Sequence, residues 1–436
     1  MKYTPNPSPV VEEMLKTIGL TSLDDLFKDI KDGLKLHELQ IPAGISEMEL
    51  RRRLKDLAAR NINTEEYPCF LGAGAYDRYI PAALEQLLLR SEFYSAYTPY
   101  QPEISQGILQ SIFEYQTMIC KLTGLDVSNA SLYDGGSALA EACNVAWAHG
   151  KGRKKVVIPD TVHPEYLDIL QAYSLSGRLQ VEVIPSHDGS VDVEAMVKAI
   201  DGNTACAIIQ QPNFYGIIED PSLVAKAAHD HKALFIMAVE PISLALLKSP
   251  GEWGADIAVG EGQPLGNSLS FGGPYLGFMA SQKSLMRKIP GRIVGQTTDE
   301  DSHRAYVLTL QAREQHIRRE LAGSNICSNE ALCALAATIY LTLVGEKGLK
   351  DIATRSHSLA VYACQAFKKA GLELKYQKPF FNEFALKIDD PGAANRRLLE
   401  NRIIGGYELD GALLLAFTEK RTKHEIDQLV AILGGK

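Results

Sequence analysis

Short apolar runs alternate with helical patterns along residues 63–325 of the chain. Seven of these runs have the length and apolar content of buried strands: 130–133, 156–159, 180–185, 205–210, 234–239, 256–260 and 276–280. Ahead of the first run, Ile108, Ile112 and Tyr115 follow helical spacing, and Gly124 is placed to end that helix. The alternation predicts an α/β fold with a seven-stranded, mostly parallel sheet and helices on both of its faces.

The two flanking regions have different patterns. Residues 1–62 hold three short amphipathic segments, too small to form a core alone, which we expect to pack on the body or on a partner. An apolar helix is predicted from 328 to 345, and a small α+β unit follows with helices at 355–370, 393–401 and 423–433 and strands at 383–388 and 413–418. We therefore predict a helical N-terminal arm (1–62), a large α/β domain (63–325), and a connecting helix with a small C-terminal α+β domain (326–436).

Charge and composition exclude several classes of function. The 45 Lys and Arg residues against 53 Asp and Glu give a net charge of -8, so no basic surface for nucleic acid is expected. The apolar run at 331–344 is too short to span a membrane and fits a buried helix better. The seven cysteines are scattered without a CxxC pair, and no closely spaced His/Cys cluster suggests a metal. The chain reads as a cytoplasmic protein with reduced thiols, without metal, membrane or nucleic acid.

Two glycine-containing turns and one histidine are candidates for ligand contacts. Gly135 and Gly136 follow an apolar run and lead into a helix that starts near Ser137, where free N–H groups would suit a phosphate. A plain strand-to-helix turn is an equally good interpretation. Gly72-Ala73-Gly74 lacks the third glycine of a dinucleotide fingerprint, so a structural tight turn is favoured. His163 follows a strand, where a capping or packing role is the commoner one.

An aromatic, proline-braced segment lies at 93–103. Two prolines exclude a regular helix there, and three tyrosines crowd it. Such a loop is typical of a cleft wall or a subunit contact, and an ordinary packed loop fits about as well.

The residues at 96–107, 250–257, 313–320 and 324–327 closely resemble the glycine decarboxylase P-protein family of the glycine cleavage system. The order of segments resembles it over nearly the whole chain, and the length fits subunit 1 of the split bacterial form. The resemblance implies a pyridoxal-phosphate (PLP)-dependent transferase of the aspartate-aminotransferase-like fold type I, which works as a dimer with sites at the subunit interface.

PLP chemistry needs a lysine for the Schiff base and an acid for the pyridine nitrogen. In this fold the acid lies at the end of the strand at 234–239, which is followed here by Glu240 and not by Asp. The resemblance puts Gln263 near the Schiff-base position. No lysine occurs between 249 and 282. We therefore expect no catalytic residue and no cofactor in this chain, with PLP on partner subunit 2. The degenerate positions are Gln263, Glu240, Gly135, Gly136 and Ser137.

The resemblance also implies the reaction and its partners. With subunit 2, glycine dehydrogenase (aminomethyl-transferring) decarboxylates glycine and passes the aminomethyl group to the lipoyl arm of H-protein, with a functional link to the T- and L-proteins. Two copies of each subunit are expected. The residues predicted to line the cleft or interface are Tyr97, Thr98, Pro99, Tyr100, Gln101, Glu103, Arg292, Arg313, His316 and Arg318. For the region with Arg313, His316 and Arg318, a solvated helical face is the alternative. Two other functions stay open: an independent PLP enzyme that uses a displaced lysine such as Lys283, and a non-catalytic scaffold for H-protein.

Overall fold

The computed structural model describes residues 6–36, 40–326 and 330–435. Contacts divide the chain into two compact units, 1–62 and 63–436. The first unit contains α1 (Ser8–Thr17), the 3₁₀ turns η1 (Leu23–Phe27) and η2 (Asp32–Leu34), and α2 (Glu47–Ala58). Ser46 starts α2 with a capping box, in which its hydroxyl accepts from Glu49 N–H and the Glu49 carboxylate accepts from Ser46 N–H. No residue of α2 is buried.

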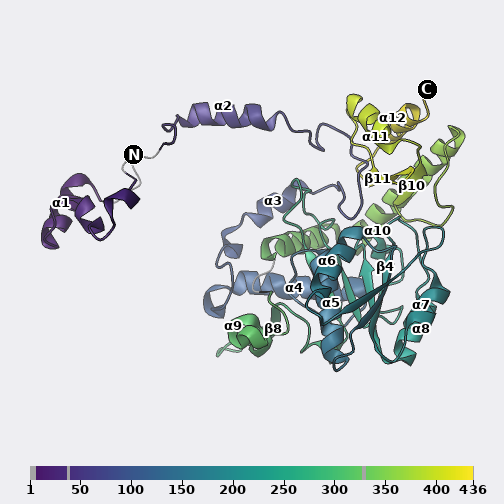
Figure 1. Ribbon diagram of the computed structural model, residues 1–436, viewed down its shortest axis with the longest axis horizontal. Coiled ribbons are helices and arrows are strands. Elements are labelled where there is room, and N and C mark those ends of the chain that lie inside the picture. Colours follow the sequence, from purple (N-terminus) through teal and green to yellow (C-terminus); the bar gives the residue numbers. More distant parts are fainter. Residues whose placement is uncertain (1–5, 37–39, 327–329, 436) are drawn as a thin grey trace. The chain divides into compact units, whose positions relative to one another are not determined.

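A seven-stranded sheet organises the second unit (Figure 1). Its strands lie in the order β1-β7-β6-β5-β4-β2-β3, and β7 runs antiparallel to both of its neighbours while the others pair in parallel. The strands are β1 (Val127–Ser128), β2 (Lys155–Pro159), β3 (Gln180–Ile184), β4 (Thr204–Gln211), β5 (Leu234–Val239), β6 (Ile257–Glu261) and β7 (Gly277–Ser281). β5, β6 and β7 are buried at every residue, and apolar residues make up most of each strand.

Helices cover both faces of this sheet because successive strand residues point to opposite sides. On one face, Ile208, Ile236 and Val259 pack with α5 (Gly135–His149) and α6 (Pro164–Ser174). On the other face, Ile209, Phe235 and Met237 join a second core. The helices of that core are α4 (Gln106–Thr123), α7 (Val193–Ala199), α8 (Ser222–Asp230) and the first part of α10 (Ala331–Lys369). As predicted, α4 ends at Gly124, which adopts the left-handed conformation.

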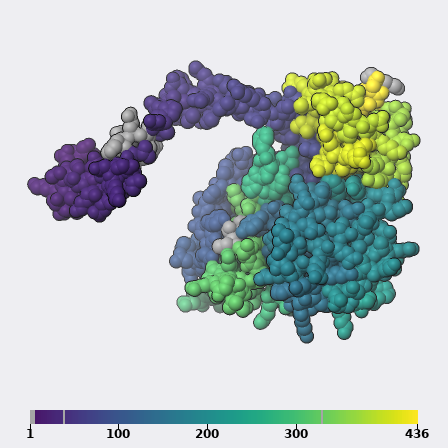
Figure 2. Space-filling view, viewed as in Figure 1, coloured from purple at the N-terminus to yellow at the C-terminus, as the bar shows by residue number. Residues whose placement is uncertain are grey.

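The long helix α10 leads from the sheet to the C-terminal elements. Gly345 interrupts it with φ +60°, a conformation that favours glycine. Its second part packs in a third core with β10 (Glu383–Lys387), β12 (Ala412–Ala416), α11 (Pro391–Glu400) and α12 (Lys423–Leu433); β11 (Tyr407–Leu409) completes a three-stranded antiparallel sheet. In Figure 2 the C-terminal segment, coloured yellow, lies directly on the teal sheet segment. By composition α10 could cross a membrane, but half of its apolar window is buried within the protein, as in a core helix.

Several predictions differ from the structure. The predicted strand at 130–133 is wrong: β1 lies at Val127–Ser128, and Leu132 makes only one isolated bridge, to Gly277. The hairpin of β8 (Ile293–Thr298) and β9 (Arg304–Thr309) was not predicted, because half of β8 is exposed and its Gly-Gln-Thr-Thr end lacks apolar residues. Residue 328, the predicted start of the connecting helix, lies outside the described residues, as does Cys327; the six other cysteines are free thiols.

Short elements complete the second unit: α3 (Ala82–Leu88), η3 (Ser91–Phe93), η4 (Pro102–Ile104), η5 (Ser243–Ala245), η6 (Lys283–Leu285), η7 (Gln311–Arg313), α9 (Gln315–Arg318) and η8 (Arg319–Leu321). Between η3 and η4 the chain is irregular, as the prolines there predict.

Candidate functional site

A cavity of about 40 Å³ lies where β4, β5 and β6 end, the edge at which open α/β sheets bind ligands. Pockets for small molecules have volumes of roughly 300–1,000 Å³. Titratable and aromatic side chains line much of its wall: Tyr76, His163, Tyr166, Glu240, Glu261 and Glu383. The site is therefore present as a place in the fold, but its interior is nearly filled by the chain itself.

Gln263 is buried beside this cavity, with 1% of its surface exposed. Its amide Nε2 donates to the carbonyl oxygens of Tyr76 (3.1 Å) and Asn267 (2.7 Å), and its Oε1 accepts from Tyr76 N–H at 2.9 Å. These three bonds tie the segment around Tyr76 to the turn after β6. The residue at the predicted Schiff-base position thus has a structural role, and each of its two amide atoms is already hydrogen-bonded.

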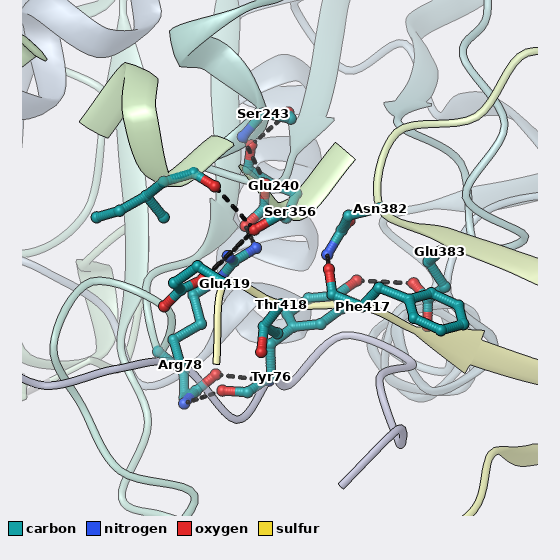
Figure 3. Close-up of polar contacts among 12 residues, drawn as sticks. Tyr76, Arg78, Glu240, Ser243, Ser356, Asn382, Glu383, Phe417, Thr418 and Glu419 are labelled. Carbon is teal, nitrogen blue, oxygen red and sulfur yellow. Dashed lines mark hydrogen bonds and ion pairs between the residues drawn. The ribbon is translucent and has the colours of Figure 1, made fainter. Parts of the chain in front are cut away.

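Glu240 follows β5 and is engaged in a buried ionic network (Figure 3). Its Oε1 lies 3.4 Å from Arg78 Nη2, and its Oε2 accepts from Ser243 N–H at 2.6 Å. Arg78 Nη1 also binds Glu419 Oε2 at 2.9 Å and Ser356 Oγ at 3.2 Å. Burial raises the pKa of Glu240, and the Arg78 charge opposes that rise. Glu240, at the degenerate position that follows the strand, is therefore the partner of an arginine.

Glu261, at the end of β6, lies against the start of α5. Its carboxylate accepts from the N–H groups of Gly135 (3.1 Å), Gln263 (2.9 Å) and Leu276 (2.9 Å). Burial raises its pKa to about 7, and the three backbone donors act in the opposite direction. The Asp134 side chain caps the same helix by accepting from Ser137 N–H at 2.7 Å. The turn at Gly135 and Gly136, for which the sequence leaves both phosphate binding and a plain strand-to-helix turn open, is thus a capped helix start that already contacts two carboxylates of this chain.

Tyr166 and the segment 72–76 close the rest of the cavity. A Cβ at Gly135 would collide with the Tyr166 hydroxyl, and the Tyr166 ring stacks on His163 with centroids 4.8 Å apart. His163 caps α6 through Nδ1, which accepts from Glu165 N–H at 3.2 Å, and its Nε2 lies 2.8 Å from the Ala73 carbonyl oxygen. This is the capping and packing role favoured by its sequence context.

The Gly72-Ala73-Gly74 turn also packs inward. Glu383 accepts from Ala73 N–H at 2.7 Å and from the Tyr76 hydroxyl at 2.9 Å, and a Cβ at Gly72 would overlap the Glu383 carboxylate. Burial raises the pKa of Glu383 to about 7. The glycines therefore permit close approach to a carboxylate, which favours the structural interpretation of this turn over the nucleotide one.

The cavity does not fit pyridoxal phosphate. No lysine lines it within the ranges that the structure covers. Lys283 begins η6 after β7, at the edge of the sheet opposite Glu261, because β7 and β6 pair with Ser281 beside Ile257. Lys248 is exposed, with its Nζ 4.3 Å from the Trp253 ring centroid. The small volume, the absence of a lysine from the lining and the Glu261 carboxylate at the start of α5 all argue against pyridoxal phosphate in this cavity.

A second region brings together candidates far apart in sequence. The Arg292 guanidinium lies 5.7 Å from the Tyr100 ring centroid, and its Nη2 is 3.5 Å from the Tyr100 hydroxyl. The His316 ring meets the Tyr100 ring edge-on at 5.3 Å, and Glu314 Oε2 lies 3.5 Å from His316 Nδ1. We call these four side chains the Tyr100 cluster. Tyr97, nearby in sequence, is 76% exposed.

The other predicted contact residues divide by environment. Arg313 is half-buried, and its guanidinium donates to the carbonyls of Ile289 and Gly291, so it holds a backbone turn. Pro99 is buried and Thr98 is half-buried, while the exposed members are Gln101, Glu103 and Arg318. Sequence reasoning missed Glu314 and Glu261. A signal for Glu261 was available, since a charged residue that ends a fully apolar strand faces the ligand-binding edge.

Comparison with known proteins shows the family of this chain. The family model described as "Glycine cleavage system P-protein" matches residues 1–433. This chain belongs to the glycine cleavage system P-protein family. A relative from Syntrophomonas wolfei, named "Probable glycine dehydrogenase (decarboxylating) subunit 1", is 64% identical over 100% of both chains. One of the same name from Carboxydothermus hydrogenoformans is 52% identical, again over 100% of both chains.

Solved structures place the P-protein chain in PLP-dependent fold type I, as predicted. A crystal structure of glycine decarboxylase (P-protein) of the glycine cleavage system, in inhibitor-bound form, matches with a TM-score of 0.93 and 39% identity over 100% of both chains. A sphingosine-1-phosphate lyase from Burkholderia pseudomallei matches with a TM-score of 0.68 and 16% identity over 92% of both chains, a likeness of fold alone.

Proposed function

We propose that this chain is the first subunit of a two-subunit glycine decarboxylase and that it binds no cofactor of its own. The observation that carries the proposal is the buried Gln263, which the resemblance places near the Schiff-base position and whose two amide atoms are hydrogen-bonded to Tyr76 and Asn267. Relatives named subunit 1 imply a partner subunit. In this proposal subunit 2 carries the pyridoxal phosphate, and the chain described here completes the active site.

The Tyr100 cluster and the loop from Tyr97 to Glu103 are the proposed contribution to that shared site. Tyrosine and arginine are enriched where proteins meet, because each combines apolar area with a polar end. Arg292 is 5% exposed and fixes one face of the Tyr100 ring, while Tyr97 projects into solvent. We propose that these residues, with Gln101, Glu103 and Arg318, cover the partner's cleft and exclude water from the reaction.

The reaction proposed for the complex follows from its family. Both subunits together decarboxylate glycine, and the aminomethyl group passes to the lipoyl arm of H-protein, with a functional link to the T- and L-proteins. Two copies of each subunit and a cytoplasmic location are part of the proposal. Six free cysteines within the described ranges support the reducing compartment.

The first test is reconstitution. Exchange of labelled bicarbonate with the glycine carboxyl group is measured with H-protein and each subunit alone, then with both. We expect the exchange rate to rise by about tenfold or more when both subunits are present, since the cleft needs both chains. A full rate with subunit 2 alone would contradict the proposal and support the scaffold function.

The second test asks whether the chain alone binds cofactor. The purified protein is mixed with pyridoxal phosphate and treated with borohydride, and its absorbance and mass are recorded. We expect no reducible band and no added mass, because the amine-bearing Lys283 lies at the opposite edge of the sheet. A stoichiometric adduct would favour the independent enzyme instead.

A further inference from the structure

The start of α5 is where this fold would hold an anion. Free N–H groups at a helix N-terminus, together with the helix dipole, attract negative charge. Gly135 N–H donates to Glu261, which lines the cavity, and the Tyr166 hydroxyl and the Glu261 backbone leave no room for a side chain at residue 135. Glycine is thus required at a helix start that faces the ligand-binding edge of the sheet.

In this chain the position is already occupied by a carboxylate. One oxygen of Glu261 accepts from Gly135 N–H, and the other accepts from the N–H groups of Gln263 and Leu276, all at 2.9–3.1 Å. Every one of these partners is a donor, and none is an acceptor. If the carboxyl group were protonated, its O–H would find no acceptor among these three contacts, so the geometry favours the ionised form.

We propose that Glu261 is a built-in anion that takes the position of a phosphate group at the start of α5 and keeps phosphate-bearing cofactors and free phosphate out of this cavity. The inference rests on the proposed function, in which the cofactor belongs to the partner subunit. The chain would then have two features that prevent cofactor binding: it lacks the Schiff-base lysine, and the Glu261 carboxylate excludes the phosphate group.

The exclusion has a physical purpose that the loss of the lysine alone does not serve. A chain with Gln263 but with a vacant helix start would still attract phosphate, because the N–H groups and dipole remain. Two subunits of like fold would then compete for one cofactor. A carboxylate in the site makes the wrong binding event costly, since an incoming phosphate meets a like charge and finds its donors taken.

The test uses the full-length chain without cofactor at pH 8, with inorganic phosphate as the probe. Binding is measured by isothermal titration and by ³¹P line broadening for the wild type, Glu261→Ala and Glu383→Ala. Glu383 is the matched control, because it is a buried carboxylate of the same cavity that does not contact α5. We expect Glu261→Ala to bind phosphate about tenfold or more tightly than the other two proteins.

Equal phosphate binding by all three proteins, or tighter binding by Glu383→Ala, would overturn the inference. If Glu261→Ala does not fold, Glu261→Gln replaces it, with urea unfolding at pH 8 as the readout. Its midpoint should fall, because an amide must turn its own N–H₂ toward one of the three donors; a midpoint equal to or above that of the wild type overturns the inference. Neither outcome bears on the exchange rate of the wild-type pair, which tests the proposed function separately.

Discussion

The cavity at the end of the sheet and the region around the Tyr100 cluster differ in how far their polar and aromatic side chains are exposed to solvent. In the cavity, Gln263 and Glu383 are 1% and 3% exposed, and their side chains are satisfied by partners within the chain. In the second region, Tyr97 and Tyr100 are 76% and 47% exposed. The first region is closed by its own hydrogen bonds, and the second presents aromatic surface to solvent. The fold alone therefore does not show where this chain functions, and the exposed side chains are better candidates than the closed cavity.

The largest expected effect comes from breaking the ionic network beside the cavity. Arg78→Ala should lower the free energy of unfolding by about 3–5 kcal/mol, because it leaves Glu240 and Glu419 buried without their cation. Urea denaturation measures this. The control is Arg51→Ala, which removes an exposed pair with Glu47 and should cost about 0.5 kcal/mol or less. Equal losses would remove the contrast between the closed region and an ordinary surface.

The second effect is a dependence of stability on pH. The pKa of Glu383 is raised by burial to about 7 in the folded chain, so the folded state binds more protons than the unfolded state between about pH 4.5 and 7. Its contribution is complete below the unfolded pKa and is lost as pH rises through 7, a change of about 3 kcal/mol at most. Glu383→Gln should reduce the slope of unfolding free energy against pH over that window, and Glu261, whose pKa is also raised to about 7, accounts for part of the slope that remains. An unchanged curve would mean that Glu383 is not protonated in the fold.

Third, Gln263→Lys tests whether one substitution reopens the closed region. We expect no absorbance band with pyridoxal phosphate, because the Glu261 carboxylate still covers α5. The unfolding free energy should fall by about 2 kcal/mol, since an ammonium cannot accept from Tyr76 N–H. Gln263→Ala provides the comparison for lost packing and hydrogen bonds. A borohydride-reducible adduct in the lysine variant would show that the cofactor site is still intact.

A substitution at the exposed Tyr97 should have the smallest effect on stability but a clear effect on activity. Tyr97→Ala should change the unfolding free energy of the isolated chain by about 0.5 kcal/mol or less, because the side chain is exposed. Glycine exchange by the reconstituted complex should fall about tenfold, equivalent to about 1.4 kcal/mol. Leu175→Ala is the matched control, being 87% exposed at the end of α6, and should leave the rate unchanged. Equal rates for both variants would take Tyr97 out of the shared site.

Prediction from the sequence succeeded where a pattern repeats locally. Six of the seven predicted strands overlap a strand of the sheet, because residues such as Phe235 and Ile236 form continuous apolar runs. It failed at 130–133, where Leu132 is buried in irregular chain with one bridge to Gly277. An apolar residue reports burial, and burial alone does not distinguish a strand from a buried loop.

The candidate site was predicted only in part for the same reason. The absence of lysine between 249 and 282 is visible in the printed sequence and is enough to predict a degenerate Schiff-base position. That Gln263 bonds to Tyr76, 187 residues away, is not visible there. Nor is the contact between Arg292 and Tyr100, which depends on how α4 and the β8–β9 hairpin pack.

By itself the sequence determined most element types, the family and the absence of a lysine between 249 and 282, because each depends on local spacing or residue identity. Only the tertiary structure decided what fills the vacated position. The approach of Glu261 to Gly135 joins β6 to α5 across 126 residues, and such contacts follow from strand order and helix packing. A buried carboxylate must find donors, and the fold, not the sequence pattern, determines which N–H groups lie within reach.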